Sequence, residues 1–242
     1  MRDSWRHFVA EFIGTFALVF VGGAAIMIAK DQASPAGLVQ IAFAHGLILA
    51  VMVSALMRIS GHFNPAVTFG FLAARRIEPL MAGVYIVAQV IGAIVAAYVL
   101  KFTFPAILFE ATRGGGQAIA LQVTGGQAFL LEFIATFFLV LVVFGTAVDP
   151  KAPRIGGLAI GLTVTADILA IGPLTGGSMN PARSFGPAVA SGIFEAQVIY
   201  WSAPIVGGIV AGVLYDFLFL RREPEPVAHG TLRPSATEKS KS

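Results

Sequence analysis

Two copies of the tripeptide Asn-Pro-Ala carry the chemistry in this chain. They occur in "GHFNPAVTFG" and "GGSMNPARSFG", as Asn64, Pro65, Ala66 and as Asn180, Pro181, Ala182. Asn is a preferred N-cap because its side-chain oxygen accepts an orphan backbone N–H, and Pro suits the first helical position because no donor is needed there. Each triplet therefore predicts the start of a helix and leaves the side-chain amide nitrogen to donate to a small polar molecule.

The elements that must position these triplets are apolar. Hydrophobic residues make up 57% of the 242 and charged residues only 12%, against roughly 25% charged in a typical soluble domain. A helix needs about 20 mainly apolar residues to cross a ~30 Å hydrocarbon core. The sequence has six such runs, at 8–29, 37–57, 80–102, 127–148, 156–172 and 196–219. It therefore predicts an all-α, multi-pass integral membrane protein with the lipid bilayer as its surroundings.

Charge and cysteine content narrow the function. If the N-terminus is cytoplasmic, twelve of the sixteen Lys and Arg residues lie on the cytoplasmic side, as the positive-inside rule requires. The C-terminus is then cytoplasmic too, and the positive charge needs no nucleic-acid partner. Residues 221–242 are polar and rich in proline, which predicts a disordered cytoplasmic tail. The chain has no cysteine, so thiol catalysis and cysteine-bound metal are excluded, and we expect neither a metal nor a cofactor.

The chain also repeats itself. "AEFIGTFALVF" from Ala10 and "LEFIATFFLVLVVF" from Leu131 share Glu-Phe-Ile-x-Thr-Phe, and the two Asn-Pro-Ala triplets lie 116 residues apart. We assign a first three-helix repeat to 1–124 and a second to 125–220. Three crossings per copy force the second copy to enter from the opposite face, which is an inverted repeat.

Each triplet falls between the second and third crossings of its own half. The apolar stretches that follow, 65–73 and 181–190, are too short to span the membrane, since about nine residues at 1.5 Å each give only ~13 Å. Two such half-helices, placed end to end from opposite faces, would fill the core. The non-helical backbone before each of them is tolerated at that depth only when it is buried in protein or lines water, so we expect a polar path through the bundle.

These motifs, with the repeat and the topology, resemble the aquaporins (the major intrinsic protein family) over about residues 7–220. "ADILAIGPLTGGSMNPARSFGPAVASG" resembles the tonoplast-intrinsic branch in particular, although the short tail would suit a prokaryotic protein of the plasma membrane equally well. The resemblance implies six transmembrane helices with two re-entrant half-helices, a homotetramer, and a pore for water or small solutes in each subunit.

The resemblance also implies a four-residue constriction. Arg183, one turn after Asn180, would line the outer vestibule with His45, Ile168 and Gly177. Counting back without a gap would place Ala44 there instead of His45, because "SGHFNPA" is shorter than the usual family pattern. A His, Ile, Gly, Arg set is similar to that of tonoplast members linked to ammonia as well as water. Ammonia is thus a further candidate permeant, although residues 103–126 lack the histidine of ammonia-conducting relatives.

Other positions have roles implied by the family. Glu11 and Glu132 would accept hydrogen bonds from the re-entrant loops, with a proton relay as the alternative reading of these intramembrane acids. His62 would line the inner vestibule. Four positions are similar to the water-selective type rather than to glycerol facilitators: Ser184, Ala188, Tyr200 and Trp201.

The sequence therefore predicts a passive water channel and not an enzyme. The two helix N-termini, each carrying about half a positive charge, and Arg183 would exclude protons and other cations. The alternative is a secondary transporter, which also uses inverted repeats and broken helices. A transporter would need an ion site at the midplane, and no acid adjoins either triplet.

Overall fold

The computed structural model describes residues 4–31 and 37–220. Within these ranges, six helices are long and apolar enough to cross a membrane. They are α1 (Ser4–Asp31), α2 (Gly37–Leu56), α4 (Pro79–Thr103), α6 (Gly125–Val143) with its π-helical continuation η2 (Phe144–Val148), α7 (Gly156–Thr175) and α9 (Gln197–Leu218). The tail expected at 221–242 lies outside the described residues.

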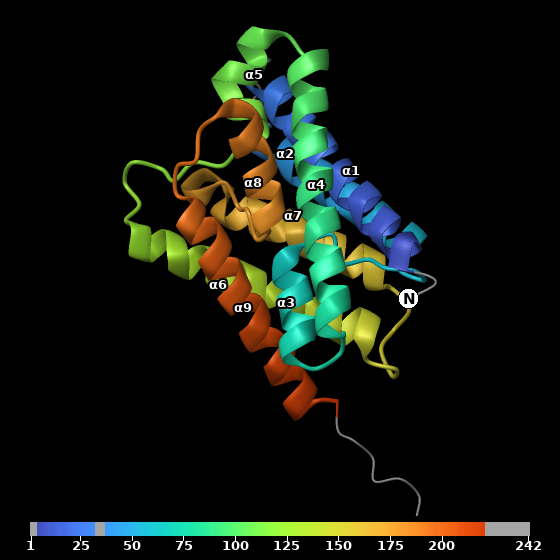
Figure 1. The fold of residues 1–242 in the computed structure, drawn as a ribbon. Helices are drawn as coiled ribbons and strands as arrows, with labels where there is room; N and C mark the ends of the chain where they lie inside the picture. The colour runs from blue at the N-terminus through green and yellow to red at the C-terminus, as the bar shows by residue number, and fades with distance from the viewer. Residues whose placement is uncertain (1–3, 32–36, 221–242) are drawn as a thin grey trace, which may run out of the picture.

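Two shorter helices begin at the Asn-Pro-Ala triplets. α3 (Pro65–Ala73) is capped by Asn64 and α8 (Pro181–Ser191) by Asn180, and in both helices the proline occupies the first turn. Their nine and eleven residues correspond to about 13 Å and about 16 Å of helix. Figure 1 shows α8 above α3 in the body of the molecule, so the two half-helices together span what each long helix spans alone.

Matching contacts hold the long helices together within each half. A Cβ added at Gly92 of α4 would lie 2.5 Å from the carbonyl oxygen of Phe12 on α1, so only glycine permits this approach. Gly207 of α9 meets the carbonyl oxygen of Phe133 on α6 in the same way. Small residues allow helices in lipid to approach this closely, and the same device recurs in both halves of the chain.

Each half-helix packs against the last long helix of the other half. Gly70 of α3 lies against the backbone of Gly208 on α9, and Gly186 of α8 lies against that of Ala93 on α4. The half-helices thereby tie the repeats into one bundle. The expected all-α fold, with six crossings and two re-entrant half-helices in an inverted repeat, is confirmed.

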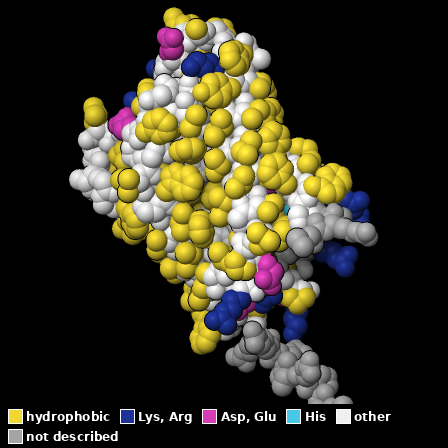
Figure 2. Space-filling model, viewed as in Figure 1, with side chains coloured by type: hydrophobic (Ala, Val, Ile, Leu, Met, Phe, Trp, Pro, Cys, Tyr) yellow, Lys and Arg dark blue, Asp and Glu magenta, His cyan; other side chains and the backbone are white. Residues whose placement is uncertain are grey.

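The outer surface is apolar between two polar ends. Figure 2 shows hydrophobic side chains over most of the visible face, with Lys, Arg, Asp and Glu gathered near its two ends. Large side chains such as Val51, Phe102 and Val198 are 61%, 81% and 81% exposed. A large exposed apolar surface marks contact with lipid, and with six helices of membrane-spanning length among the described residues the protein is an integral, multi-pass membrane protein.

Besides shifts of a few residues at helix ends, such as α1 beginning at Ser4 and α8 ending at Ser191, two local features differ from the expected runs. The fifth run was expected to end at 172, yet α7 continues to Thr175 with Pro173 inside its last turn. The loop between the third and fourth crossings contains a short helix, α5 (Ala106–Thr112), followed by the 3-10 turn η1 (Arg113–Gly115). This loop matters for the site because its next residues reach into the bundle.

Candidate functional site

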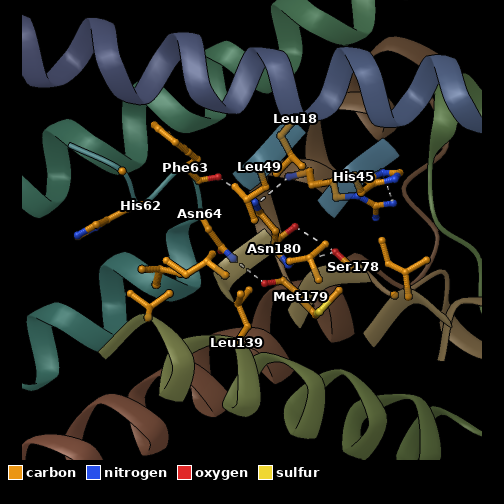
Figure 3. Close-up of a pocket in the computed structure, with 18 residues that line it drawn as sticks. Leu18, His45, Leu49, His62, Phe63, Asn64, Leu139, Ser178, Met179 and Asn180 are labelled. Atoms are coloured by element: carbon orange, nitrogen blue, oxygen red, sulfur yellow. Dashed lines mark hydrogen bonds between the residues drawn. The ribbon is translucent and has the colours of Figure 1, made fainter. Parts of the chain in front are cut away.

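A narrow cavity runs past the point where the two half-helices meet. Both re-entrant loops line it, together with apolar side chains of the long helices such as Leu18, Leu49 and Leu139 (Figure 3). Its volume is about 20 Å³, and a cavity needs roughly 10–15 Å³ to hold one water. The cavity therefore accepts water-sized molecules one at a time.

The two asparagines face each other across this cavity. Asn64 Oδ1 accepts a hydrogen bond from Ala66 N at 2.8 Å, and Asn180 Oδ1 accepts from Ala182 N at 3.1 Å. Each amide nitrogen also donates to the loop of the other half: Asn64 Nδ2 to Met179 O at 2.8 Å, and Asn180 Nδ2 to Phe63 O at 2.9 Å (Figure 3). One N–H of each amide is thus engaged by the opposite loop, and the second remains for a ligand.

The residue before each asparagine has an unusual backbone. Phe63 and Met179 have φ of 49° and 53°, in the left-handed region that side chains with a Cβ rarely adopt. Such a conformation costs on the order of 1–3 kcal/mol and persists only where the surroundings enforce it. Both side chains are buried, at 0% and 1% exposed. The same strain at equivalent positions turns each carbonyl toward the other half's asparagine.

Two buried carboxylates enforce these loop conformations. Glu11 Oε2 accepts from Phe63 N at 2.6 Å, and its Oε1 accepts from His62 N at 2.9 Å. Ser60 Oγ and Gln89 Nε2 donate to the same carboxylate. All four donors are drawn from the first re-entrant loop and α4, so Glu11 positions the loop just before Asn64.

Glu132 repeats this arrangement in the second half. Its Oε2 accepts from Met179 N at 2.7 Å, and its Oε1 accepts from Ser178 N at 2.9 Å and from Thr175 Oγ1 at 2.7 Å. Both carboxylates are 0% exposed. Bonds from backbone N–H groups to a carboxylate are among the stronger protein hydrogen bonds. The geometry therefore favours loop support over a proton relay.

The four expected constriction residues lie together at one end of the cavity. His45, Ile168, Gly177 and Arg183 all line it. His45 Nδ1 lies 2.8 Å from Ile41 O and so must donate to it, which leaves Nε2 to accept from Arg183 Nη2 at 2.9 Å. His45 is 1% exposed. The structure places His45, rather than its neighbour Ala44, against the arginine.

Two glycines shape this constriction. A Cβ added at Gly22 of α1 would overlap the His45 ring, so glycine at this position makes room for the imidazole. Gly177 has φ of 56°, and a Cβ there would lie 3.3 Å from Ile168 Cγ1. Glycine at position 177 therefore suits the positive φ and avoids crowding Ile168. The sequence analysis did not identify Gly22, whose role depends on a helix distant in the chain.

Gln117 is a further residue that the sequence analysis missed. It follows η1 in the loop between α4 and α6, and its side chain is 8% exposed. With its amide oxygen toward the guanidinium, Gln117 accepts from Arg183 Nη1 and, at 3.2 Å, from Nη2, while its nitrogen donates to Ser184 Oγ at 2.9 Å. This amide orientation is the one that satisfies the surrounding hydrogen bonds. Arg183 is thus held between Gln117 and His45.

His62 lies at the other end of the cavity. Its Nδ1 is 3.1 Å from Thr68 Oγ1, and its ring packs on Phe71 and Tyr85 with centroids 4.2 Å and 5.0 Å away. His62 also lines a wider cavity of about 250 Å³ bounded by α2, α7 and the first re-entrant loop. The narrow passage therefore opens into a vestibule at the end remote from Arg183.

The four positions similar to the water-selective type lie behind the pore wall. None of these four is among the described residues that line the narrow cavity. Ser184 Oγ bonds Ser178 Oγ, and Tyr200 Oη donates to Thr175 O at 2.8 Å. Trp201 packs edge-on against Phe185, with ring centroids 5.8 Å apart, and Ala188 is buried in α8. Ser184 and Tyr200 thus act on the second re-entrant loop through its neighbours.

Six crossings, two opposed half-helices and a narrow cavity at their junction define a channel-type membrane protein. The family profile described as "Major intrinsic protein" matches residues 1–215. The chain therefore belongs to the major intrinsic protein family.

Relatives with similar sequences carry aquaporin names. The probable aquaporin TIP3-2 of Arabidopsis thaliana is 42% identical, covering 98% of this chain and 92% of that protein. Aquaporin TIP2-3 of Zea mays is 45% identical, covering 90% and 89%. The X-ray structure of the aquaglyceroporin from Plasmodium falciparum superimposes with a TM-score of 0.76 at 25% identity, covering 89% of this chain and 96% of that one. These relatives agree with the expectation of a channel rather than an enzyme.

Proposed function

We propose that this chain is a passive water channel in which Asn64 and Asn180 bind the permeating molecule. The observation that carries this proposal is a pair of reciprocal hydrogen bonds, in which each amide donates to a backbone carbonyl of the other half's re-entrant loop, at 2.8 Å and 2.9 Å. That arrangement fixes both amides and aims their remaining N–H groups at one point. A water there accepts from both asparagines, so it can only donate its own hydrogens to its neighbours in the file and cannot accept a proton from either.

Proton and cation exclusion rests on charges fixed in the fold. The N-termini of α3 and α8 meet at the asparagines, and each carries about half a positive charge. Arg183 adds a full charge at the constriction. Among the described residues, no acidic side chain lines the narrow cavity. Nothing there compensates the positive helix ends and the arginine, which oppose the entry of a cation.

Ammonia is a second candidate permeant. Both nitrogens of His45 are occupied, one by Ile41 O and the other by Arg183, and Arg183 is held on its other side by Gln117. Ile168 and Gly177 also line the cavity and add no polar side chain to it. A constriction with few donors facing the lumen binds water less strongly, and so lowers the penalty for a neutral molecule that replaces it.

Topology and assembly complete the proposal. We place both termini in the cytoplasm, so that Arg183 lies toward the outer face and His62 toward the inner one. Division into repeats at 1–124 and 125–220 is supported by the matching contacts of Gly92 and Gly207. As in the family, we expect a homotetramer with one pore in each subunit.

Stopped-flow measurement on proteoliposomes tests the function. Wild type is expected to pass water far faster than empty vesicles, ammonia measurably and glycerol poorly. Arg183→Val should admit larger solutes and protons, and His45→Phe should narrow the constriction and lower water flux. Flux that saturates or follows an ion gradient would favour a secondary transporter. Wild-type water flux equal to that of empty vesicles would refute the water channel.

A further inference from the structure

An open groove lies between the C-terminal ends of α3 and α9, outside the pore. Its volume is about 570 Å³, within the roughly 300–1,000 Å³ of sites that bind small ligands. Its lining combines the charged side chains of Arg75, Arg76 and Asp216 with the apolar side chains of Val213 and Phe217. The groove lies at one end of the bundle, at the boundary between the apolar surface and the polar end.

The charges in this groove do not cancel. Arg76 donates from Nε and Nη2 to Asp216 Oδ1, at 2.8 Å and 2.5 Å, which neutralises that acid. Arg75 is exposed, and among the described residues its guanidinium has no hydrogen bond or ion pair. One net positive charge therefore remains, and an anion in the groove would pair with it.

The apolar side of the groove identifies the kind of anion. Val213 and Phe217 lie one turn apart on α9 and are 43% and 80% exposed. A free anion would leave this wall uncovered, whereas the acyl chain of a lipid would cover it while its phosphate reached Arg75. Basic pockets between transmembrane helices are a recurring way of binding anionic headgroups.

We propose that the groove formed by Arg75, Arg76, Val213 and Phe217 binds the phosphodiester headgroup of an anionic phospholipid. The lipid lies along α9 with its phosphate on Arg75, next to the end of the half-helix that presents Asn64. Arg76 also lines the vestibule beside His62, so the bound headgroup adjoins one mouth of the passage. This site depends on the membrane location of the chain and not on which solute the pore conducts.

Native mass spectrometry of the full-length protein in detergent tests this site, with phosphatidylglycerol as the probe. Arg75→Gln is expected to raise the apparent Kd about fivefold, the factor for ~1 kcal/mol per basic residue near a lipid surface. Arg75→Lys should retain most of the affinity. Arg58→Gln, another exposed arginine that does not line the groove, is the matched control and should stay within about twofold of wild type.

Two results would overturn the proposal. Equal affinities of the Arg75→Gln and Arg58→Gln proteins would show that phosphatidylglycerol binds without this groove. Displacement of the lipid by glycerol phosphate at matched concentration would identify a site for free anions. Loss of water conduction alone would leave the lipid site standing, so the two proposals fail separately.

Discussion

Replacing Glu132 by Gln tests whether the buried carboxylates hold the re-entrant loops. The change keeps the shape of the side chain but turns one acceptor oxygen into an NH2 donor. Wild-type Glu132 accepts Thr175 Oγ1 and Ser178 N on Oε1 and Met179 N on Oε2. A glutamine oxygen placed at Oε1 keeps two of these bonds, and its nitrogen then faces the Met179 N–H, donor against donor.

The expected loss of stability follows from the number of hydrogen bonds that the variant loses. A buried backbone N–H left without a partner costs about 1–3 kcal/mol. The two surviving bonds also lose charge assistance, which makes them weaker. Met179 no longer has the contact that enforces its φ of 53°. We therefore expect Glu132→Gln to lower the free energy of unfolding by about 2–4 kcal/mol.

Thermal unfolding in detergent and water flux in vesicles measure the two consequences. A loss of this size corresponds to a fall in Tm of roughly 4–16 °C at this chain length. Water flux per folded channel should fall with it, because Met179 O no longer holds Asn64 Nδ2. The matched control is Glu195→Gln, whose carboxylate pairs with Arg113 and is 54% exposed. An exposed pair contributes about 0–1 kcal/mol, so the control should unfold close to wild type.

A proton relay through Glu132 would give the opposite pattern. The variant would then unfold at the wild-type temperature and conduct water normally, while any proton flux of the wild type disappeared. That result would refute the loop-support argument for both acids, since Glu11 is bonded in the same way.

The other predictions concern the constriction and the absence of cysteine. Gly22→Ala should force the His45 ring away from Arg183, at an overpacking cost of about 1–3 kcal/mol, and should lower water flux several-fold. Its control is Gly83→Ala, where no atom lies within 4 Å of the added Cβ and flux should be unchanged. Equal water flux through the two variants would contradict the packing argument. Gln117→Leu should remove the hydrogen bonds on one side of Arg183 and change the ratio of ammonia to water flux. Gln122→Leu, at an exposed position, should leave that ratio unchanged. An unchanged ratio in both variants would show that Gln117 does not position Arg183. Because the chain has no cysteine, mercuric chloride should not block water flux, and reversible block by a thiol-specific reagent would count against this.

The half-helices were predictable because a few neighbouring residues specify where each of them begins. Asn followed by Pro specifies a cap and a first turn regardless of what surrounds it, and α3 and α8 begin where those residues stand. The apolar runs likewise predicted the long helices from length and composition. The end of α7 was misplaced because Pro173 favours termination, whereas in the structure it sits within the last turn.

The finer geometry of the site depends on contacts between distant segments. Nothing local requires Phe63 or Met179 to adopt positive φ, since each depends on a carboxylate from another helix. The choice between His45 and Ala44 needed the position of Arg183, which only the folded bundle supplies. Gln117 lies in an irregular loop that contains several glycines, and nothing in its local sequence indicated which distant residue it contacts.

The way both re-entrant loops are tied down bears on how conduction responds to temperature. Every loop donor bound by Glu11 and Glu132 is already satisfied before a molecule enters, so the wall has no slow rearrangement to complete at each passage. Cooling should therefore slow transport only as much as it slows the exchange of hydrogen bonds in the liquid itself. An activation energy for water permeation close to that of self-diffusion in bulk water would indicate a pore wall that is fully ordered before water enters.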